Sequence, residues 1–225
     1  MGGGQVNNYS TKTIPRATAK RLPLYLRNLT ILHSKGIVRI KSKEFSKITQ
    51  VPPATIRRDF SYLGELGRSG YGYEVGFLIK VFSELLDSYE ENRIAIVGFG
   101  NLGKALANNN FRRNQNLTID CVFDTDPAIV GQTVGGFYVY SMADFEKVVR
   151  EKNIKTAIST VPSEYAQEAI DIVVHSGITA ILNFAPDRVE VPDSVSMRYI
   201  DLTTELLTLL FFDRNYKKPS LVATS

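Results

Sequence analysis

The chain has few of the residues from which disulfides, metal sites and hydrolytic centres are built. A single cysteine, Cys121, excludes an intramolecular disulfide and a metal site made of several cysteines. It lies in the apolar stretch 119–123, which is typical of a buried strand where a thiol is inert. The two histidines, His33 and His175, fall at the ends of expected helices, and no nucleophile elbow, P-loop or metal-ligand cluster occurs. These absences argue against an enzyme and against a bound metal.

Long apolar runs are also missing. None approaches the roughly 18 residues that a membrane helix needs. Residues 1–13 have no apolar signal-peptide core and are typical of a flexible tail. We therefore expect a cytoplasmic protein without a membrane partner. Its 225 residues, 44% apolar and 22% charged, are enough for two folded domains.

Charge is divided unevenly along the chain. Residues 1–80 carry 14 Lys and Arg against 4 Asp and Glu, whereas residues 81–225 carry 13 against 19. This asymmetry predicts that the first segment meets a polyanion and that the second does different work. A solvated basic surface would explain the excess of positive charge equally well. The arrangement of these charges on the expected helices must therefore distinguish it from a surface that binds a polyanion.

Residues 14–80 have the pattern of a helix-turn-helix domain with a wing. Apolar periodicity predicts helices at 18–34, 43–49 and 54–63. The glycine-rich segment 67–75 follows and is typical of a β-hairpin. The first domain is therefore expected to be a winged helix.

The third helix of this domain has the pattern of a DNA-reading helix. Ile56, Phe60 and Leu63 form an apolar face, which leaves Arg57 and Arg58 on other faces. Arginine in the major groove binds guanine or clamps phosphate. The residues expected to contact double-stranded DNA are Lys43, Lys47, Arg57, Arg58, Ser61, Arg68, Tyr71 and Gly72.

A dinucleotide motif opens the second domain. A short apolar strand at 93–97 runs into Gly98-Phe99-Gly100-Asn101-Leu102-Gly103 and then into an expected helix. Gly98 permits a tight turn, Gly100 lets the backbone approach a pyrophosphate, and Gly103 lets helix and strand pack closely. The amino end of the helix faces the anion. All six residues are expected to bind a nucleotide.

A carboxylate follows the next strand. Asp124 ends the apolar strand 117–123 and comes about 21 residues after Gly103, close to the spacing of a ribose ligand. A carboxylate there repels a 2′-phosphate, which favours NAD(H) over NADP(H). Asp120 competes for this role, but its mid-strand position favours a place in the sheet.

Strands and helices alternate through the rest of this domain, which predicts a doubly wound parallel sheet. Residues that follow its strands are expected to border the ligand crevice. These residues are Thr160, Val161, Pro162, Asn183, Phe184 and Pro186. The predicted fold class is therefore α/β, with a winged helix-turn-helix domain at 14–80 and a Rossmann-type domain at 81–200.

The C-terminal segment 201–225 is expected to form a helix and a tail. Its leucines and phenylalanines cover nearly the whole circumference of the helix, so the helix must be buried on several sides. It packs on its own domain or inserts into a second subunit, and the pattern leaves both open. A winged helix that reads a two-fold operator favours a homodimer.

Residues 14–216 resemble the Rex family of bacterial redox-sensing transcriptional repressors. The resemblance is carried by segments 14–27, 56–67, 70–75 and 96–106, and by Phe123-Asp124, Thr160-Val161-Pro162 and Asn183-Phe184-Ala185-Pro186. It implies a homodimer whose C-terminal helices are exchanged between subunits. Such a dimer is expected to bind palindromic operators when NADH is scarce and to leave them when NADH binds.

The resemblance also assigns roles to single residues. Arg57 and Arg58 correspond to major-groove readers, residues 68–72 to a minor-groove wing, the three glycines to the pyrophosphate turn and Asp124 to the ribose ligand. Arg27 and Asp201 correspond to a pair that couples the DNA-binding domain to the partner's C-terminal helix. In one departure, Asn108-Asn109-Asn110 stands where some members carry a tyrosine of this relay.

Two other functions fit part of the pattern. One is a small NAD-dependent oxidoreductase, which would consume NADH with a carbonyl substrate. The other is a regulator that answers CoA or another adenine nucleotide, which ligand competition would reveal.

Overall fold

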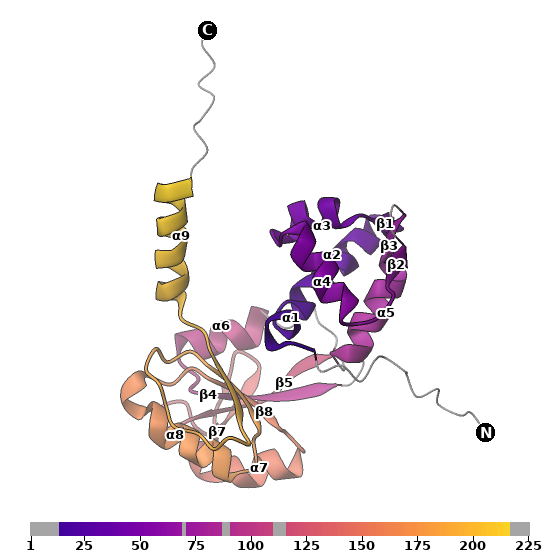
Figure 1. Ribbon diagram of the computed structural model, residues 1–225. Helices are drawn as coiled ribbons and strands as arrows, with labels where there is room; N and C mark the ends of the chain where they lie inside the picture. The colour runs from indigo at the N-terminus through magenta and orange to yellow at the C-terminus, as the bar shows by residue number, and fades with distance from the viewer. Residues whose placement is uncertain (1–13, 69–70, 87–90, 110–115, 217–225) are drawn as a thin grey trace, which may run out of the picture. The chain divides into compact units, whose positions relative to one another are not determined.

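The structure is a computed structural model that describes residues 14–68, 71–86, 91–109 and 116–216 (Figure 1). The chain divides after residue 90 into two compact units, each described by itself below. Within the described ranges, no helix is long and apolar enough to cross a membrane.

The first unit combines short helices with a small antiparallel sheet of order β1-β3-β2. Helices α3 and α4 form the predicted helix-turn-helix, and the β2–β3 hairpin follows them as the wing. In chain order its elements are α1 (Arg16–Ala19), α2 (Leu22–Ser34), β1 (Arg39–Ile40), α3 (Ser42–Thr49), α4 (Pro53–Ser61), β2 (Gly67–Arg68), β3 (Gly72–Glu74) and α5 (Val75–Leu85).

Two helices differ from the sequence-based expectation. The stretch expected as one helix over 18–34 is broken into α1 and α2, with Pro23 in the first turn of α2, where proline favours a helix start. Helix α5 spans the domain boundary that was expected at residue 80. It belongs wholly to the first unit because Val75, Leu78 and Phe82 are buried in that unit's core.

Aromatic rings hold the first unit together. Tyr25 of α2, Phe60 of α4 and Phe82 of α5 meet with ring centroids 5.4–6.2 Å apart. Phe45 of α3 lies 5.7 Å from Tyr25. Each of these rings is nearly or wholly buried. The contacts bring α2, α3, α4 and α5 around one core, as the apolar face of the predicted third helix requires.

The second unit is a seven-stranded sheet of order β10-β9-β8-β4-β5-β7-β6, parallel except for the β6–β7 pair. Helix α6 covers one face, and α7 and α8 cover the other (Figure 1). In chain order its elements are β4 (Asn92–Val97), α6 (Asn101–Asn109), β5 (Leu117–Asp124), β6 (Thr133–Val134), β7 (Phe137–Ser141), the 3-10 turn η1 (Met142–Asp144), α7 (Phe145–Glu151), β8 (Thr156–Ser159), α8 (Ser163–His175), β9 (Ala180–Asn183), β10 (Ser196–Tyr199) and α9 (Leu202–Tyr216).

The strand order creates a switch point beside β4. The chain leaves β4 for β5 on one side and later returns to β8 on the other side. In doubly wound sheets, ligands bind in the crevice at the carboxyl ends of two such strands. The glycine turn after β4 and Thr160 after β8 lie at these ends.

Helix α9 does not pack on its own unit. Each of its residues is exposed, and Leu206, Leu207 and Phe211 show 55%, 62% and 56% of their surface. An apolar patch of this size in water marks an interaction surface. Of the two expected alternatives, packing on its own domain is therefore wrong for this chain.

Candidate functional sites

The glycine turn has the geometry that its sequence predicts. Gly98 has a φ of +85°, a left-handed conformation that glycine adopts without a steric cost. A Cβ at Gly103 would overlap the carbonyl oxygen of Gly98, so no larger residue fits without a shift of the turn. A Cβ at Gly100 would meet nothing within 4 Å. The fold itself therefore does not require glycine at position 100, in agreement with a role toward a ligand.

Thr160 fastens this turn from the neighbouring strand. Its hydroxyl donates a hydrogen bond to the carbonyl oxygen of Gly98 at 2.6 Å. The same hydroxyl would lie 3.1 Å from a Cβ added at Gly103. The expected crevice residue Thr160 is thus also a structural brace of the turn.

Asp124 lies against the turn at the end of β5. Its Oδ2 accepts a hydrogen bond from the N–H of Phe99 at 2.5 Å. Its Oδ1 accepts bonds from the N–H groups of Thr125 and Asp126 at 2.7 and 2.9 Å. A carboxylate has about four acceptor positions, so these three bonds leave one for a ribose hydroxyl. The structure thus brings Asp124 and the glycine turn together.

Two neighbouring side chains have other roles. The ring of Phe99 is buried and meets Phe137 edge-on at 6.1 Å, so only the backbone of Phe99 is available to a nucleotide. Asp120, the competing carboxylate, accepts a hydrogen bond from Lys152 at 2.6 Å and pairs with Arg93 at 3.4 Å. The Asp120 carboxylate is thus engaged by two basic side chains around the sheet, in agreement with the structural role that its mid-strand position predicted.

The residues after β8 and β9 lie at the same edge of the sheet. The N–H of Phe184 donates to the carbonyl oxygen of Ser159 at 3.0 Å, which keeps the two strand ends aligned. Asn183 is fully buried, and its Oδ1 accepts a bond from the N–H of Ala185 at 3.2 Å. Its side chain therefore shapes the loop. Val161 and Phe184 are half-buried, and Pro162, Pro186, Asn101 and Leu102 are exposed.

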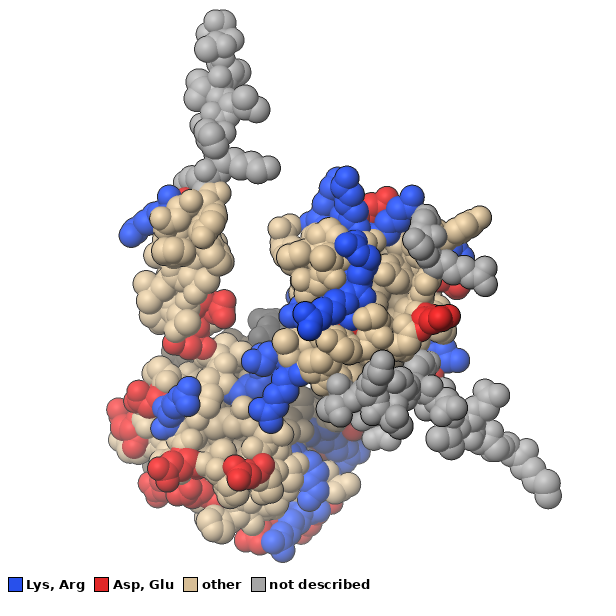
Figure 2. Space-filling view, viewed as in Figure 1, with Lys and Arg blue, Asp and Glu red and all other residues tan. Residues whose placement is uncertain are grey.

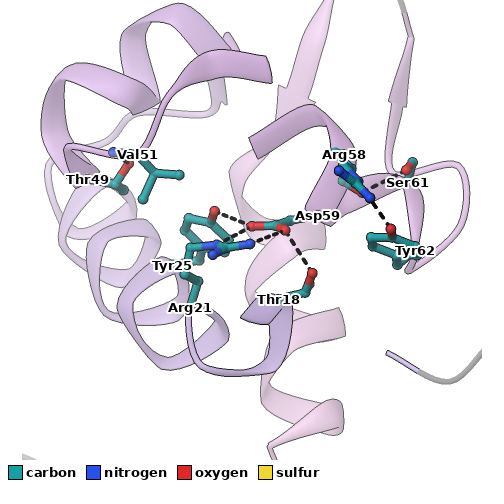
Figure 3. Close-up of polar contacts among 9 residues, drawn as sticks. All are labelled: Thr18, Arg21, Tyr25, Thr49, Val51, Arg58, Asp59, Ser61 and Tyr62. Carbon is teal, nitrogen blue, oxygen red and sulfur yellow. Dashed lines mark hydrogen bonds and ion pairs between the residues drawn. The ribbon is translucent and has the colours of Figure 1, made fainter. Parts of the chain in front are cut away.

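Helix α4 presents its arginines to solvent. Arg57 donates from Nη1 to the Ser42 hydroxyl at 3.1 Å. Arg58 donates from Nε to the Tyr62 hydroxyl at 3.2 Å (Figure 3). Each of these bonds uses one of the five N–H donors of a guanidinium group. The Ser61 hydroxyl donates to the carbonyl oxygen of Arg58 at 2.7 Å, so Ser61 is engaged within its own helix.

Among the charged residues on the visible surface of the first unit, Lys and Arg cover more of the surface than Asp and Glu (Figure 2). Lys43 and Lys47 on α3 are exposed, as are Arg57 and Arg58 on α4. A polyanion that meets α4 therefore also meets the positive charges of α3, as the division of charge along the chain predicted.

The wing is described in part. Ser69 and Gly70 at its tip lie outside the described residues, and for Arg68 only the backbone is described. Tyr71 is 74% exposed. Gly72 has a φ of +79°, and a Cβ there would lie 2.7 Å from the carbonyl oxygen of Ile40. Gly72 is therefore needed for the packing of β3 on β1, whatever its contact with DNA.

A buried acidic residue that the sequence analysis did not single out lies on α4. Asp59 accepts four hydrogen bonds, two from Arg21 and one each from Tyr25 and Thr18 (Figure 3). Burial raises the pKa of Asp59, but the bonds from Arg21, Tyr25 and Thr18 outweigh burial and hold the pKa below its usual value. The signal available in the sequence was its position, because Asp59 and Phe60 follow Ile56 at helical spacing.

The two residues expected to couple the domains belong to different units. Arg27 is exposed on α2. Asp201 caps α9, where its Oδ1 accepts a bond from the N–H of Thr203 at 2.9 Å and its Oδ2 one from the Thr204 hydroxyl at 2.5 Å. The bond from the Thr204 hydroxyl lowers the pKa of Asp201. Of the asparagines that replace the relay tyrosine, Asn108 donates to the carbonyl oxygen of Lys104 at 3.0 Å.

No group of three or more His, Cys, Asp or Glu residues that could hold a metal occurs in the part of the chain that the structure describes. Cys121 is 1% exposed, and burial raises the pKa of its thiol to about 12. A thiol in this setting stays protonated and inert at neutral pH.

Comparison with known proteins gives matches in both units. Residues 13–61 match the family described as "Putative DNA-binding protein N-terminus", and residues 89–187 match the family described as "CoA binding domain". The redox-sensing transcriptional repressor Rex 2 of Enterococcus faecalis is 61% identical over 91% of this chain and 95% of its own length. The repressor Rex of Latilactobacillus sakei is 53% identical over 89% and 96%.

Solved structures agree with these matches. The Rex-family repressor RSP is 30% identical, with a TM-score of 0.81 over 91% of this chain and 95% of its own. RSP with β-NAD+ and operator DNA also gives 0.81, over 91% and 94%. RSP with β-NADH gives 0.79, over 92% and 96%.

A DNA-binding domain joined to a Rossmann-type domain defines a ligand-sensing transcription regulator. The close relatives are named as repressors, which confirms the expectation of a regulator over an oxidoreductase. The chain belongs to the Rex family of redox-sensing transcriptional repressors.

Proposed function

We propose that this chain binds operator DNA as a homodimer and that NADH in the glycine turn releases it. The observation that carries the proposal is the glycine turn at the β4–β8 switch point with Asp124 bonded to it. RSP, which shares the fold, has been solved with β-NADH and with β-NAD+ and operator DNA. A repressor of bacterial operators acts in the cytoplasm.

The chemistry of Asp124 favours NAD(H) over other adenine nucleotides. NADP(H) carries a phosphate on its adenosine ribose, and so does CoA. The Asp124 carboxylate would repel either phosphate, whereas it accepts a hydrogen bond from an unmodified ribose hydroxyl. The pyrophosphate would lie at the start of α6 over Gly100, with Asn101, Leu102 and the loops after β8 and β9 around the remaining ligand.

The redox signal is expected to reach the protein as a bound nucleotide rather than by thiol oxidation. Cysteine reactivity requires a thiolate that solvent can reach. Cys121 is buried with a pKa of about 12, so it meets neither condition.

DNA reading is assigned to α4 with support from α3 and the wing. Arg57 and Arg58 are adjacent on α4, about 100° apart around the helix axis. One is therefore expected to reach a base edge and the other a phosphate, with further phosphate contacts from Lys43 and Lys47. Alanine at the base reader should cost about 1–3 kcal/mol on the operator and relax discrimination at one base pair per half-site.

Helix α9 supplies the proposed dimer contact. Its exposed apolar surface needs a partner surface that covers it. A second copy of the chain can supply that surface, and a dimer also matches the two half-sites of a two-fold operator. Deleting residues 201–225 should give monomers or aggregates in analytical ultracentrifugation. A dimeric truncation that still responds to NADH would contradict this assignment.

Arg27 and Asp201 are proposed to couple the nucleotide to DNA binding. Coupling is a free energy distinct from affinity. Asp201→Ala should therefore reduce the effect of NADH on DNA binding more than it reduces NADH affinity. If Asp201→Ala reduced the NADH effect on DNA binding and the NADH affinity equally, Asp201 would have only a capping role on α9.

One titration tests the whole proposal. Binding of the full chain to operator and to scrambled DNA is measured by fluorescence anisotropy while NADH, NAD+, NADPH or CoA is added. We expect NADH to release operator DNA at lower concentrations than the other three. Release by CoA at equal concentration, or operator binding that no nucleotide changes, would overturn the proposal.

A further inference from the structure

Asp59 is a charged residue on the buried side of α4, directly after the two arginines. We propose that Arg58 is the base reader of α4 and that Asp59 is its positioning residue, which fixes the rotation of α4 about its own axis and hence the direction of Arg58. The inference rests on the proposed function, in which α4 reads the operator.

The geometry of the carboxylate is that of a fixed anchor. Oδ2 accepts from Arg21 Nε at 2.6 Å and from the Tyr25 hydroxyl at 2.6 Å. Oδ1 accepts from Arg21 Nη2 at 2.7 Å and from the Thr18 hydroxyl at 2.8 Å. All of the roughly four acceptor positions of the carboxylate are therefore used. The two parallel bonds from Arg21 add the directional constraint of a bidentate pair.

The donors belong to one side of the unit. Thr18 lies on α1, Arg21 directly precedes α2, and Tyr25 lies on α2. Asp59 therefore ties α4 to the N-terminal helices at a single point, 34 to 41 residues away in the sequence. Asp59 is 1% exposed as a residue, so water has little access to its carboxylate.

Apolar packing alone would hold α4 less strictly. Ile56 and Phe60 bury the same side of the helix, but hydrophobic contact is non-directional. A rotation of α4 by about 20° would move a point on its outer surface by about 2 Å. That shift would break bonds of 2.6–2.8 Å to Asp59 and would carry the Arg58 guanidinium away from a base edge.

The polar network around Asp59 is also directly adjacent to Arg58. Asp59 is next to Arg58 in the chain, and the Arg58 side chain is held at the Tyr62 hydroxyl at 3.2 Å (Figure 3). The carbonyl oxygen of Arg58 accepts the bond from Ser61. The backbone of α4 is thus fixed by Asp59 on its inner side, while the guanidinium of Arg58 is ordered on its outer side.

The test is Asp59→Asn in the full chain, which keeps the shape of the side chain but replaces one acceptor oxygen by a donor. The preference for operator over scrambled DNA should fall roughly tenfold, as for a misplaced base reader. Affinity for scrambled DNA and its salt dependence should stay within about twofold, because the phosphate contacts remain. Glu65→Gln, at an exposed residue of the same unit, is the control for the change in charge.

A double-mutant cycle separates positioning from simple stability. In an Arg58→Ala background, Asp59→Asn should reduce the operator preference no further, because the reader that it positions is absent. A merely structural role would lower operator and scrambled binding by the same factor in both backgrounds. That result, or an unchanged operator preference in folded Asp59→Asn, would overturn the inference.

If Asp59→Asn does not fold, Tyr25→Phe takes its place, because it removes one donor and keeps the aromatic core. Its operator preference should fall by roughly threefold, less than for loss of a base contact. An unchanged preference in Tyr25→Phe would then overturn the inference. If Arg57→Ala and Arg58→Ala both bind operator like the wild type, the proposed function fails instead, since α4 then does not read DNA.

Discussion

Alanine at Gly103 should destabilise the second unit, whether or not a nucleotide is bound. The added Cβ would overlap the carbonyl oxygen of Gly98 and lie 3.1 Å from the Thr160 hydroxyl. Overpacking of this kind costs about 1–3 kcal/mol. The carbonyl oxygen of Gly98 cannot move without weakening its 2.6 Å bond from Thr160, which adds about 1 kcal/mol.

The melting temperature converts this cost into an observable. A loss of about 2–4 kcal/mol in a unit of this size lowers the melting temperature by roughly 10 °C. Differential scanning calorimetry of the full chain without nucleotide would resolve such a shift. Melting at the wild-type temperature would show that the turn accommodates a side chain and would refute this account of Gly103.

Alanine at Gly100 is the matched control because its Cβ would meet nothing within 4 Å. Gly100 has no positive φ, so alanine should leave stability unchanged or raise it by about 0.4–1 kcal/mol through the unfolded state. If a pyrophosphate lies against this backbone, NADH binding should nevertheless weaken by about 1.5–3 kcal/mol, or roughly 10- to 150-fold. Calorimetric titration with unchanged NADH affinity would remove Gly100 from the nucleotide site.

Three further predictions concern single side chains. Cys121→Ala should keep the full response of DNA binding to NADH, and a response to hydrogen peroxide that is lost in this variant would establish a thiol sensor. Asp124→Asn should weaken NADH binding by about 1–3 kcal/mol in calorimetry and lessen the discrimination against NADPH; unchanged affinity would place the ribose elsewhere. The lowered pKa of Asp59 means that its stabilising contribution is present above the unfolded-state pKa of about 4 and is lost as pH falls through the folded-state pKa. Acid titration followed by circular dichroism should therefore show a step in the first unit that Asp59→Asn lacks, and an identical acid titration of both proteins would contradict this.

The nucleotide turn could be predicted from sequence because its determinants are local. Strand, glycines and helix follow one another within 93–109, and steric rules connect each glycine to one position of the turn. The proximity of Asp124 to the turn follows from the strand order, since β4 and β5 are neighbouring parallel strands. Sequence could not show that the ring of Phe99 points into the core, because the motif fixes the backbone and leaves that side chain open.

The Asp59 network could not be predicted for the opposite reason. Its donors Thr18, Arg21 and Tyr25 lie 34 to 41 residues earlier in the chain, and nothing local brings them to α4. Because Arg21 lies in a basic segment, its sequence position indicates only a surface charge that could contact DNA. Only the packing of α2 on α4 shows that it neutralises a buried carboxylate.

A fixed reading helix limits how NADH could act. Asp59 holds α4 to α1 and α2 of its own unit. NADH bound to the second unit is therefore not expected to act by rotating α4, because that rotation would break the bonds to Asp59. NADH would instead change the spacing of the two α4 helices of a dimer, which must fit half-sites that are one helical turn of DNA, or about 34 Å, apart. Rigid-body movement of domains about an interface is a known form of such switching.

NADH should then weaken binding to the full operator by a large factor and leave binding to a single half-site within about twofold, since a half-site imposes no spacing. Anisotropy titrations on the two DNAs decide this, and an equal loss on the half-site would show that NADH disturbs the first unit itself.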